Sequence, residues 1–147
     1  MHANRRIAAH ALRSFNVRLF EAVGTPREIA ECVAEILVNA DLRGHTSHGV
    51  FHTTGYLSQI EKGSLIPDAL PRIIRETDTA VTVDARRGWG HHAAQWCMEL
   101  AMMKAAKAGV ASVAAHNINH IGRLGEYAEQ AADAGFLSMA LSGWGGR

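Results

Sequence analysis

The stretch of sequence that decides the fold class is Arg72-Ile-Ile-Arg-Glu-Thr-Asp-Thr-Ala-Val-Thr-Val-Asp84. Two short runs rich in β-branched residues, 72–77 and 80–84, lie on either side of Asp78, a residue type common in turns. This pattern predicts a β-hairpin. Before it stand Pro67 and Pro71, where the residue pattern changes from helical to mixed α and β. We therefore expect the chain to divide at residues 66 and 67.

The residues before the hairpin predict three helices. The first is expected over about 5–22, where large apolar side chains recur on one side. The second is expected over about 26–42. In its start signal, Thr25-Pro-Arg-Glu28, threonine can cap the helix, proline suits the first turn and glutamate closes a capping box. Ser47 can cap a third helix that runs to about Lys62. Residues 1–66 therefore predict a helical subdomain.

The residues after the hairpin alternate between helical and strand patterns. We expect a helix over about 91–108, a strand over 110–115, a helix over about 122–134 and a buried strand over 136–141. The fold class is therefore mixed α/β. Because a sheet normally continues after a buried strand, we expect residues 67–147 to be an incomplete domain, and the chain to be truncated.

Composition limits the classes of function. The chain has 147 residues and a formal net charge of +1, which gives no electrostatic reason to expect nucleic acid or an anionic membrane as partner. Cys32 and Cys97 lie in apolar helical patterns, typical of buried free thiols in a reducing compartment. No apolar run is long enough to span a bilayer. The acid-free, arginine-containing start superficially suits a mitochondrial presequence, but a basic helix face explains it better. We expect a cytoplasmic protein.

The first segment that could carry chemistry is Asp41-Leu-Arg-Gly-His-Thr-Ser-His-Gly49. It joins two predicted helices and places Ser47 and His48 at a helix amino-terminus, where free N–H groups and a positive dipole suit a carboxylate or a developing oxyanion. A histidine there can exchange a proton near neutral pH. The alternative is that His45 and His48 are capping or packing residues.

The second segment is His116-Asn-Ile-Asn-His-Ile-Gly-Arg-Leu-Gly-Glu-Tyr127, between a predicted strand and a predicted helix. Ligands of α/β proteins often bind at the carboxyl ends of strands. His120 could exchange a proton there while Arg123 holds an anion. The alternative is a polar loop with a capping asparagine.

The third segment is Gly88-Trp-Gly-His-His-Ala93, which satisfies the dinucleotide fingerprint G-x-G-x-x-A. The next predicted strand ends in His116-Asn117, with no acid placed to hold a ribose. The preceding strand also fits a hairpin better than the first strand of a βαβ unit. We therefore interpret this match as structural.

Zinc is the remaining alternative. His48 and His52 are four residues apart, as are His116 and His120. The zincin pattern needs glutamate directly after the first histidine, and Gly49 and Asn117 stand at those positions. We predict no metal site, although a small histidine-rich metalloprotein stays an alternative reading.

Taken together, these segments resemble the malate/L-lactate dehydrogenase family of non-Rossmann oxidoreductases, which includes ureidoglycolate dehydrogenase and Δ1-piperideine-2-carboxylate reductase. The resemblance is carried by residues 40–50, by Tyr56, Ile60 and Gly63, by Asp84 with Gly88 and Gly90, and by residues 116–127. It covers the amino-terminal portion of the family's pattern. It implies hydride transfer between NADH or NADPH and a 2-oxo acid, ketone or cyclic imine. It also implies a homodimer whose second domain binds the cofactor.

The resemblance also implies roles for individual residues. His48 and His120 match histidines that act as proton donors in different members. Ser47 would orient the substrate, and Arg43 or Arg123 would hold its carboxylate or order the loop. Many members have arginine where this chain has His52, so this histidine would be a shorter, pH-dependent anchor. The resemblance assigns no cofactor-contacting residues here. The alternative function is a non-catalytic fragment or binding module.

Overall fold

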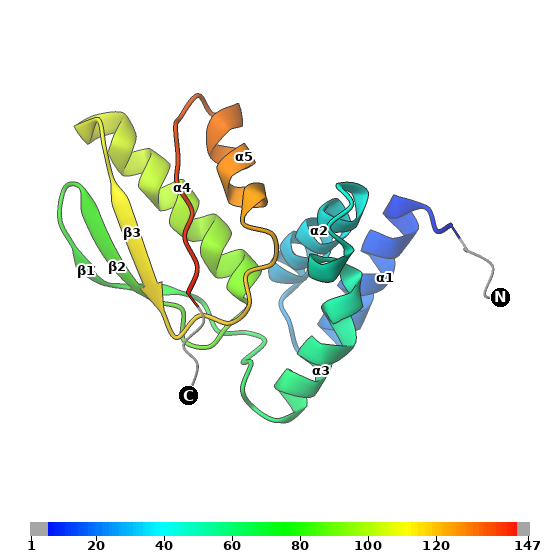
Figure 1. Cartoon of the computed structure of the whole chain (residues 1–147). Helices are drawn as coiled ribbons and strands as arrows, with labels where there is room; N and C mark the ends of the chain where they lie inside the picture. The colour runs from blue at the N-terminus through cyan, green and yellow to red at the C-terminus, as the bar shows by residue number, and fades with distance from the viewer. Residues whose placement is uncertain (1–5, 144–147) are drawn as a thin grey trace.

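The structure is a computed structural model that describes residues 6–143. Its fold is mixed α/β, as the sequence predicts. Figure 1 shows two groups of elements, with helices α1, α2 and α3 on one side and a small sheet with α4 and α5 on the other. α1 spans Ala9–Ala22, α2 spans Arg27–Leu42 and α3 spans Thr53–Glu61. The sheet consists of β1 (Arg72–Glu76), β2 (Ala80–Asp84) and β3 (Ser112–His116), and α4 and α5 span Gly90–Ala108 and Gly125–Asp133.

The start of α2 differs from the prediction. No side chain caps the helix, and the N-cap residue is Pro26, so the capping box predicted from Thr25 and Glu28 is wrong. The hydroxyl of Thr25 instead accepts a hydrogen bond from the indole Nε1 of Trp89 at 3.0 Å. A long-range partner has therefore replaced the local one. α1 begins at Ala9, later than expected, and Arg5 lies outside the described residues.

The third helix also begins later than predicted. Residues 46–52 form two short 3-10 turns, η1 (Thr46–His48) and η2 (Val50–His52), before α3 starts. Ser47 therefore does not cap an α-helix. Gly49 separates the turns in an extended conformation (φ −92°, ψ −155°), which interrupts helical geometry. The carboxylate of Asp41 stabilises this break by accepting a hydrogen bond from the backbone N–H of Val50 at 3.0 Å.

The sheet has the order β1-β2-β3. β1 and β2 form the predicted antiparallel hairpin, whereas β2 and β3 are parallel and are connected through α4. β2 therefore belongs to a hairpin and also begins a βαβ unit. The sequence interpretation treated these roles as competing, and that contrast is wrong, because one strand has two edges and can pair differently along each.

The last predicted strand is absent. Residues 136–141 form no regular secondary structure and pair with no strand of the described chain, and Leu137, Met139 and Leu141 are exposed. Alternation of apolar side chains favours an extended conformation. A ladder also needs a neighbouring strand, and none lies against this segment within residues 6–143.

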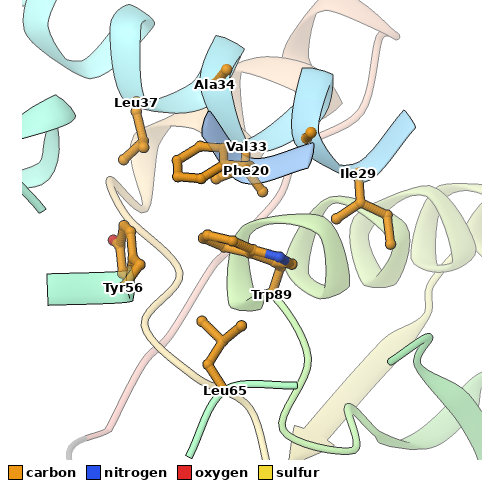
Figure 2. Packing of buried hydrophobic residues seen from close by; sticks show 9 residues of the cluster. Phe20, Ile29, Val33, Ala34, Leu37, Tyr56, Leu65 and Trp89 are labelled. Carbon is orange, nitrogen blue, oxygen red and sulfur yellow. The ribbon is translucent and has the colours of Figure 1, made fainter. Parts of the chain in front are cut away.

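The main core joins the two groups of elements. Figure 2 shows the indole of Trp89 surrounded by apolar side chains from α1, α2, α3 and the segment before the sheet. Its members are Phe20, Ile29, Ala30, Val33, Ala34, Leu37, Tyr56, Leu65 and Trp89. A second, smaller cluster under the sheet contains Val81, Val83 and Leu100. The first cluster takes members from both sides of residues 66 and 67, and a domain boundary there stays a prediction.

Candidate active site

Three imidazole side chains gather where the 3-10 turns approach the loop after β3. His48 ends η1, His52 ends η2, and His120 lies between β3 and α5. The ring centres of His48 and His120 are 5.7 Å apart, and those of His52 and His120 are 4.8 Å apart. Figure 1 shows why: the chain leaving β3 runs towards the helical group before it turns back into α5. The fold thus unites two separate predicted segments. We call these three residues the histidine cluster.

Ser47 contacts two members of the histidine cluster. Its hydroxyl Oγ lies 3.0 Å from Nδ1 of His48. A hydroxyl can donate or accept, so this contact persists whether or not Nδ1 carries a hydrogen. The backbone oxygen of Ser47 lies 2.6 Å from Nε2 of His52. Because a carbonyl oxygen only accepts, Nε2 of His52 carries a hydrogen.

Below the cluster, two buried side chains continue the hydrogen bonding. The hydroxyl of Tyr56 lies 2.8 Å from Nδ1 of His120 and 3.3 Å from Nε2 of His91. Tyr56 comes from α3 and His91 from the first turn of α4. Both are almost completely buried, at 2% and 0% exposed, whereas His120 is half-buried. A chain of polar groups therefore runs from the core to the cluster.

Burial controls the charge of these groups. It lowers the pKa of His91 to about 3, so His91 is neutral at physiological pH. It raises the pKa of Tyr56, so the phenol keeps its hydrogen. The pKa of His120 is lowered by burial first and then by the neighbouring charges of His52 and His48. The part of the cluster nearest the core thus favours uncharged forms.

The two candidate arginines lie in an ion-pair network beside the cluster. Arg43 pairs with Glu129, and Arg123 pairs with Glu126 and Glu129 at 2.9 and 2.8 Å. The side chain of Arg123 is 11% exposed, and that of Arg43 is 45% exposed. The network holds the loop after β3 against α5 and the end of α2. The role of either arginine in binding substrate stays a prediction.

The glycines of the G-x-G-x-x-A segment serve packing. A Cβ on Gly90 would overlap the backbone oxygens of Asn119 and His120, and one on Gly88 would overlap that of Ala69. Trp89 between them is buried in the core. Carbonyl oxygens repel phosphate, so these residues do not form a cradle for a dinucleotide. The structural interpretation of this motif is supported.

Other candidate chemistry is limited. Within residues 6–143 no group of three or more histidine, cysteine, aspartate or glutamate side chains is arranged to hold a metal ion. None of the described helices is both long and apolar enough to cross a membrane.

Both cysteines are free and half-buried, and burial raises the pKa of Cys32 to about 12 and that of Cys97 to about 11. Both therefore remain thiols, with low nucleophilicity.

Sequence reasoning gave no role to His91 and no chemical role to Tyr56. Tyr56 follows His52 by four residues, a spacing that places both on one helical face. His91 belongs to the third segment, which we interpreted as purely structural. The contact between α3, α4 and the loop after β3 depends on the tertiary structure, so no local sequence pattern predicts it.

Comparison with known proteins agrees with this architecture. Residues 7–143 match the family described as malate/L-lactate dehydrogenase. The chain is 40% identical over 139 residues to hydroxycarboxylate dehydrogenase B of Escherichia coli O157:H7, covering 95% of this chain and 38% of that protein. It is 32% identical over 151 residues to (2R)-3-sulfolactate dehydrogenase (NADP(+)) of Chromohalobacter salexigens, covering 98% of this chain and 45% of that protein. The solved structure of malate dehydrogenase from Pyrococcus horikoshii OT3 superposes with a TM-score of 0.86 at 39% identity, covering 89% of this chain and 38% of the other.

The fold is thus that of a mixed α/β protein similar to malate/L-lactate dehydrogenases. The chain belongs to the malate/L-lactate dehydrogenase family. The family resemblance read from the sequence is confirmed. The chain spans about two fifths of the length of the first curated relatives that it matches.

Proposed function

We propose that this chain supplies the proton-exchanging side of an oxidoreductase that interconverts 2-hydroxy acids and 2-oxo acids, with NAD or NADP as redox partner. The observation that carries the proposal is the histidine cluster. It brings both candidate proton donors to one place, with ring centres 5.7 Å apart. Support for the substrate class comes from relatives named for hydroxycarboxylate, malate and sulfolactate.

The chemistry asks for a proton at the substrate oxygen. As the carbonyl carbon is reduced, its oxygen gains negative charge and takes up a proton. A proton donor beside that oxygen lowers the barrier, as does any hydrogen-bond donor that stabilises the developing charge. His48 is our first assignment for the proton donor and His120 our second. Ser47, in contact with His48, orients the substrate and the imidazole.

Three further side chains are candidates to hold the substrate carboxylate. His52 belongs to the cluster, and Arg43 is partly exposed beside Glu129, so each has a side chain that a small anion could reach. Arg123 is held by two carboxylates, and it acts more simply by ordering the loop that carries His120. A small-molecule acid is therefore the proposed ligand.

The chemistry supplied by a bound reduced nicotinamide is the hydride. The G-x-G-x-x-A segment does not fit its phosphates, because backbone carbonyl oxygens crowd Gly88 and Gly90, so this segment is not the cofactor site. The relative named for NADP(+) supports NADP as one of the two options. By the same family resemblance we propose a homodimer. A cytoplasmic location is proposed from the sequence alone.

The test is turnover by the purified chain. NADH and NADPH are offered separately with oxaloacetate and a panel of other 2-oxo acids, and the loss of reduced nicotinamide is followed by absorbance. His48→Gln is expected to lower kcat by at least about 100-fold, the usual size of a general acid–base contribution. His45→Gln is the matched control, since His45 is exposed and lies in the same segment.

Two outcomes would oppose the proposal. Full activity of His48→Gln would remove His48 as proton donor. No turnover of any acid, together with a thermal unfolding curve that neither cofactor shifts, would support the non-catalytic alternative for this chain, because a ligand that binds the folded form must stabilise it.

A further inference from the structure

His48 and His120 each contact a hydroxyl group, but the two hydroxyls differ in freedom. Ser47 is exposed, and its Oγ can turn to donate to His48 or to accept from it. Tyr56 is buried and has a second partner, His91, on its other side. The two histidines are therefore not equivalent as proton carriers.

The position of the ring hydrogen on His91 determines which groups donate and which accept in the hydrogen bonds that link His91, Tyr56 and His120. His91 is neutral and so carries one ring hydrogen. Its Nε2 faces the hydroxyl of Tyr56, and its Nδ1 has no hydrogen-bond partner in the described structure. A buried N–H without an acceptor is a rarer and costlier arrangement than an unused acceptor. The hydrogen therefore belongs on Nε2, where it donates to the Tyr56 oxygen.

Tyr56 then has one arrangement that satisfies its own hydrogen. With its oxygen accepting from His91, its O–H donates to Nδ1 of His120 across the shorter distance of 2.8 Å. Nδ1 of His120 must then be bare, and the ring hydrogen of neutral His120 lies on Nε2.

A second proton on His120 would break this order. Nδ1 would become a donor facing Tyr56, whose own hydrogen would turn towards buried surroundings without an acceptor. Charge around the His120 ring also disfavours a second proton. His48 and His52 from the two 3-10 turns face the ring, and either repels an added positive charge when it is itself protonated. His91 from α4 also faces the ring, but it is neutral and offers no negative charge that would stabilise a cation there.

We propose that Tyr56 and His91 are positioning residues that hold His120 as a neutral imidazole with its hydrogen on Nε2, so that His48 alone exchanges the proton. This rests on the proposed function. In reduction, the hydride that a reduced nicotinamide would supply forms the new C–H bond at the carbonyl carbon, and the C=O π electrons move to oxygen. A proton passes from protonated His48 to that oxygen, and His48 is left neutral. His120 donates a hydrogen bond through Nε2 and keeps its hydrogen throughout.

The inference is tested without substrate, by nitrogen-15 NMR of the histidine rings in the uniformly labelled 15.9 kDa chain. Long-range proton–nitrogen spectra show which ring nitrogen carries hydrogen. We expect His120 near neutral pH to show hydrogen on Nε2 and none on Nδ1, without averaging. We also expect the pKa of His120 to lie below the ordinary value of a histidine. Hydrogen on Nδ1 of His120, or a pKa of His120 above that ordinary value, would overturn the proposal.

Variants distinguish a role of Tyr56 and His91 in setting the protonation of His120 from a role in packing alone. Tyr56→Phe removes the hydrogen bond to the neutral form of His120, so its titration shifts to higher pH and its Nδ1 signal changes. His91→Phe releases the Tyr56 oxygen to accept from Nδ1–H, and the titration shifts in the same direction. His92→Gln, on the same helix but without contact to Tyr56, serves as the control and leaves His120 unchanged. No shift in either folded variant would contradict the assignment.

Turnover then distinguishes the two proposals. In an active chain, His120→Gln lowers kcat by a smaller factor than His48→Gln does, whereas an equal or larger loss contradicts this division of roles. In an inactive chain the proposed function fails, and the ring spectra still decide the protonation state of His120.

Discussion

The indole nitrogen of Trp89 donates a hydrogen bond to the hydroxyl of Thr25 at 3.0 Å, and both residues are buried. Trp89 directly precedes α4, while Thr25 directly precedes the N-cap of α2. The indole ring also packs against Phe20, with ring centres 4.7 Å apart, and against Tyr56 at 5.5 Å. One residue therefore anchors the helical group to the sheet group through both polar and apolar contacts (Figure 2).

The first prediction concerns this hydrogen bond. Thr25→Val keeps the shape of the side chain but leaves the indole N–H buried without an acceptor, which costs about 1–3 kcal/mol of unfolding free energy. Urea denaturation followed by tryptophan fluorescence measures it. The matched control is Thr54→Val, because Thr54 is exposed. Equal stability of the two variants would show that the Trp89–Thr25 bond contributes nothing.

The second prediction concerns the close approach at Gly90. Gly90→Ala places a Cβ against the backbone oxygens of Asn119 and His120, and backbone atoms cannot move aside cheaply. We expect a loss of about 2 kcal/mol or more, as for other overpacked sites, and a displaced His120 loop. Gly55→Ala is the control, because its Cβ meets open space within α3. That change should stabilise the chain by up to about 1 kcal/mol, the helix-propensity difference. Thermal unfolding compares both with the parent.

The third prediction concerns pH. His91 has a pKa of about 3 when folded and about 6.5 when unfolded, so below pH 6.5 only the unfolded chain takes up its proton. Protonation of His91 in the unfolded chain therefore has no effect on the free energy of unfolding well above pH 6.5. It lowers that free energy increasingly as the pH falls from 6.5 towards 3. The expected slope approaches about 1.4 kcal/mol for each pH unit. Urea denaturation at about pH 7 and about pH 5 should show a smaller difference for His91→Gln than for the parent. His10→Gln, at an exposed position, should leave the slope as it is.

The fourth prediction concerns substrate affinity. His52→Arg replaces a pH-dependent anchor with a permanent, planar cation that can bind a carboxylate through two hydrogen bonds. We expect KM for a 2-oxo acid near neutral pH to fall about tenfold, equivalent to one additional charge-assisted hydrogen bond. Steady-state kinetics at several pH values measures it, with His52→Gln as the uncharged comparison. An unchanged KM would place His52 away from the substrate.

Local patterns predicted most of the fold. The hairpin, the helix over α4 and the helical start follow from periodicity and turn residues close in sequence. Errors arose where a distant contact competed with a local signal. Thr25 binds Trp89 instead of capping α2. Ser47 lies in the first 3-10 turn, and the Asp41 carboxylate accepts a hydrogen bond from the backbone N–H of Val50, where the second turn begins. For residues 136–141 the apolar alternation was present, but no strand in the described chain pairs with it.

The candidate site was predictable only in parts. Spacing and resemblance pointed to His48, His52 and His120, but no pattern in the sequence reports that their rings meet. The roles of Tyr56 and His91 could be inferred only from the structure. They depend on burial and on the Tyr56 hydroxyl, which contacts histidines from α4 and from the loop after β3. The ion pairs of Arg43 and Arg123 with Glu129 likewise join the end of α2 to α5.

The two kinds of pairing along β2 imply an order of folding events. The hairpin with β1 closes over a few residues, and such hairpins form within about 1–10 μs. The parallel pairing, which sets Ala80 beside Ser112, requires α4 to form and cross over first. Closing that longer loop costs more chain entropy before any contact is gained. The loop that carries His120 follows β3, so the histidine cluster assembles only after this slower step. A protein stopped early in folding would already hold its hairpin, and it would still lack its histidine cluster.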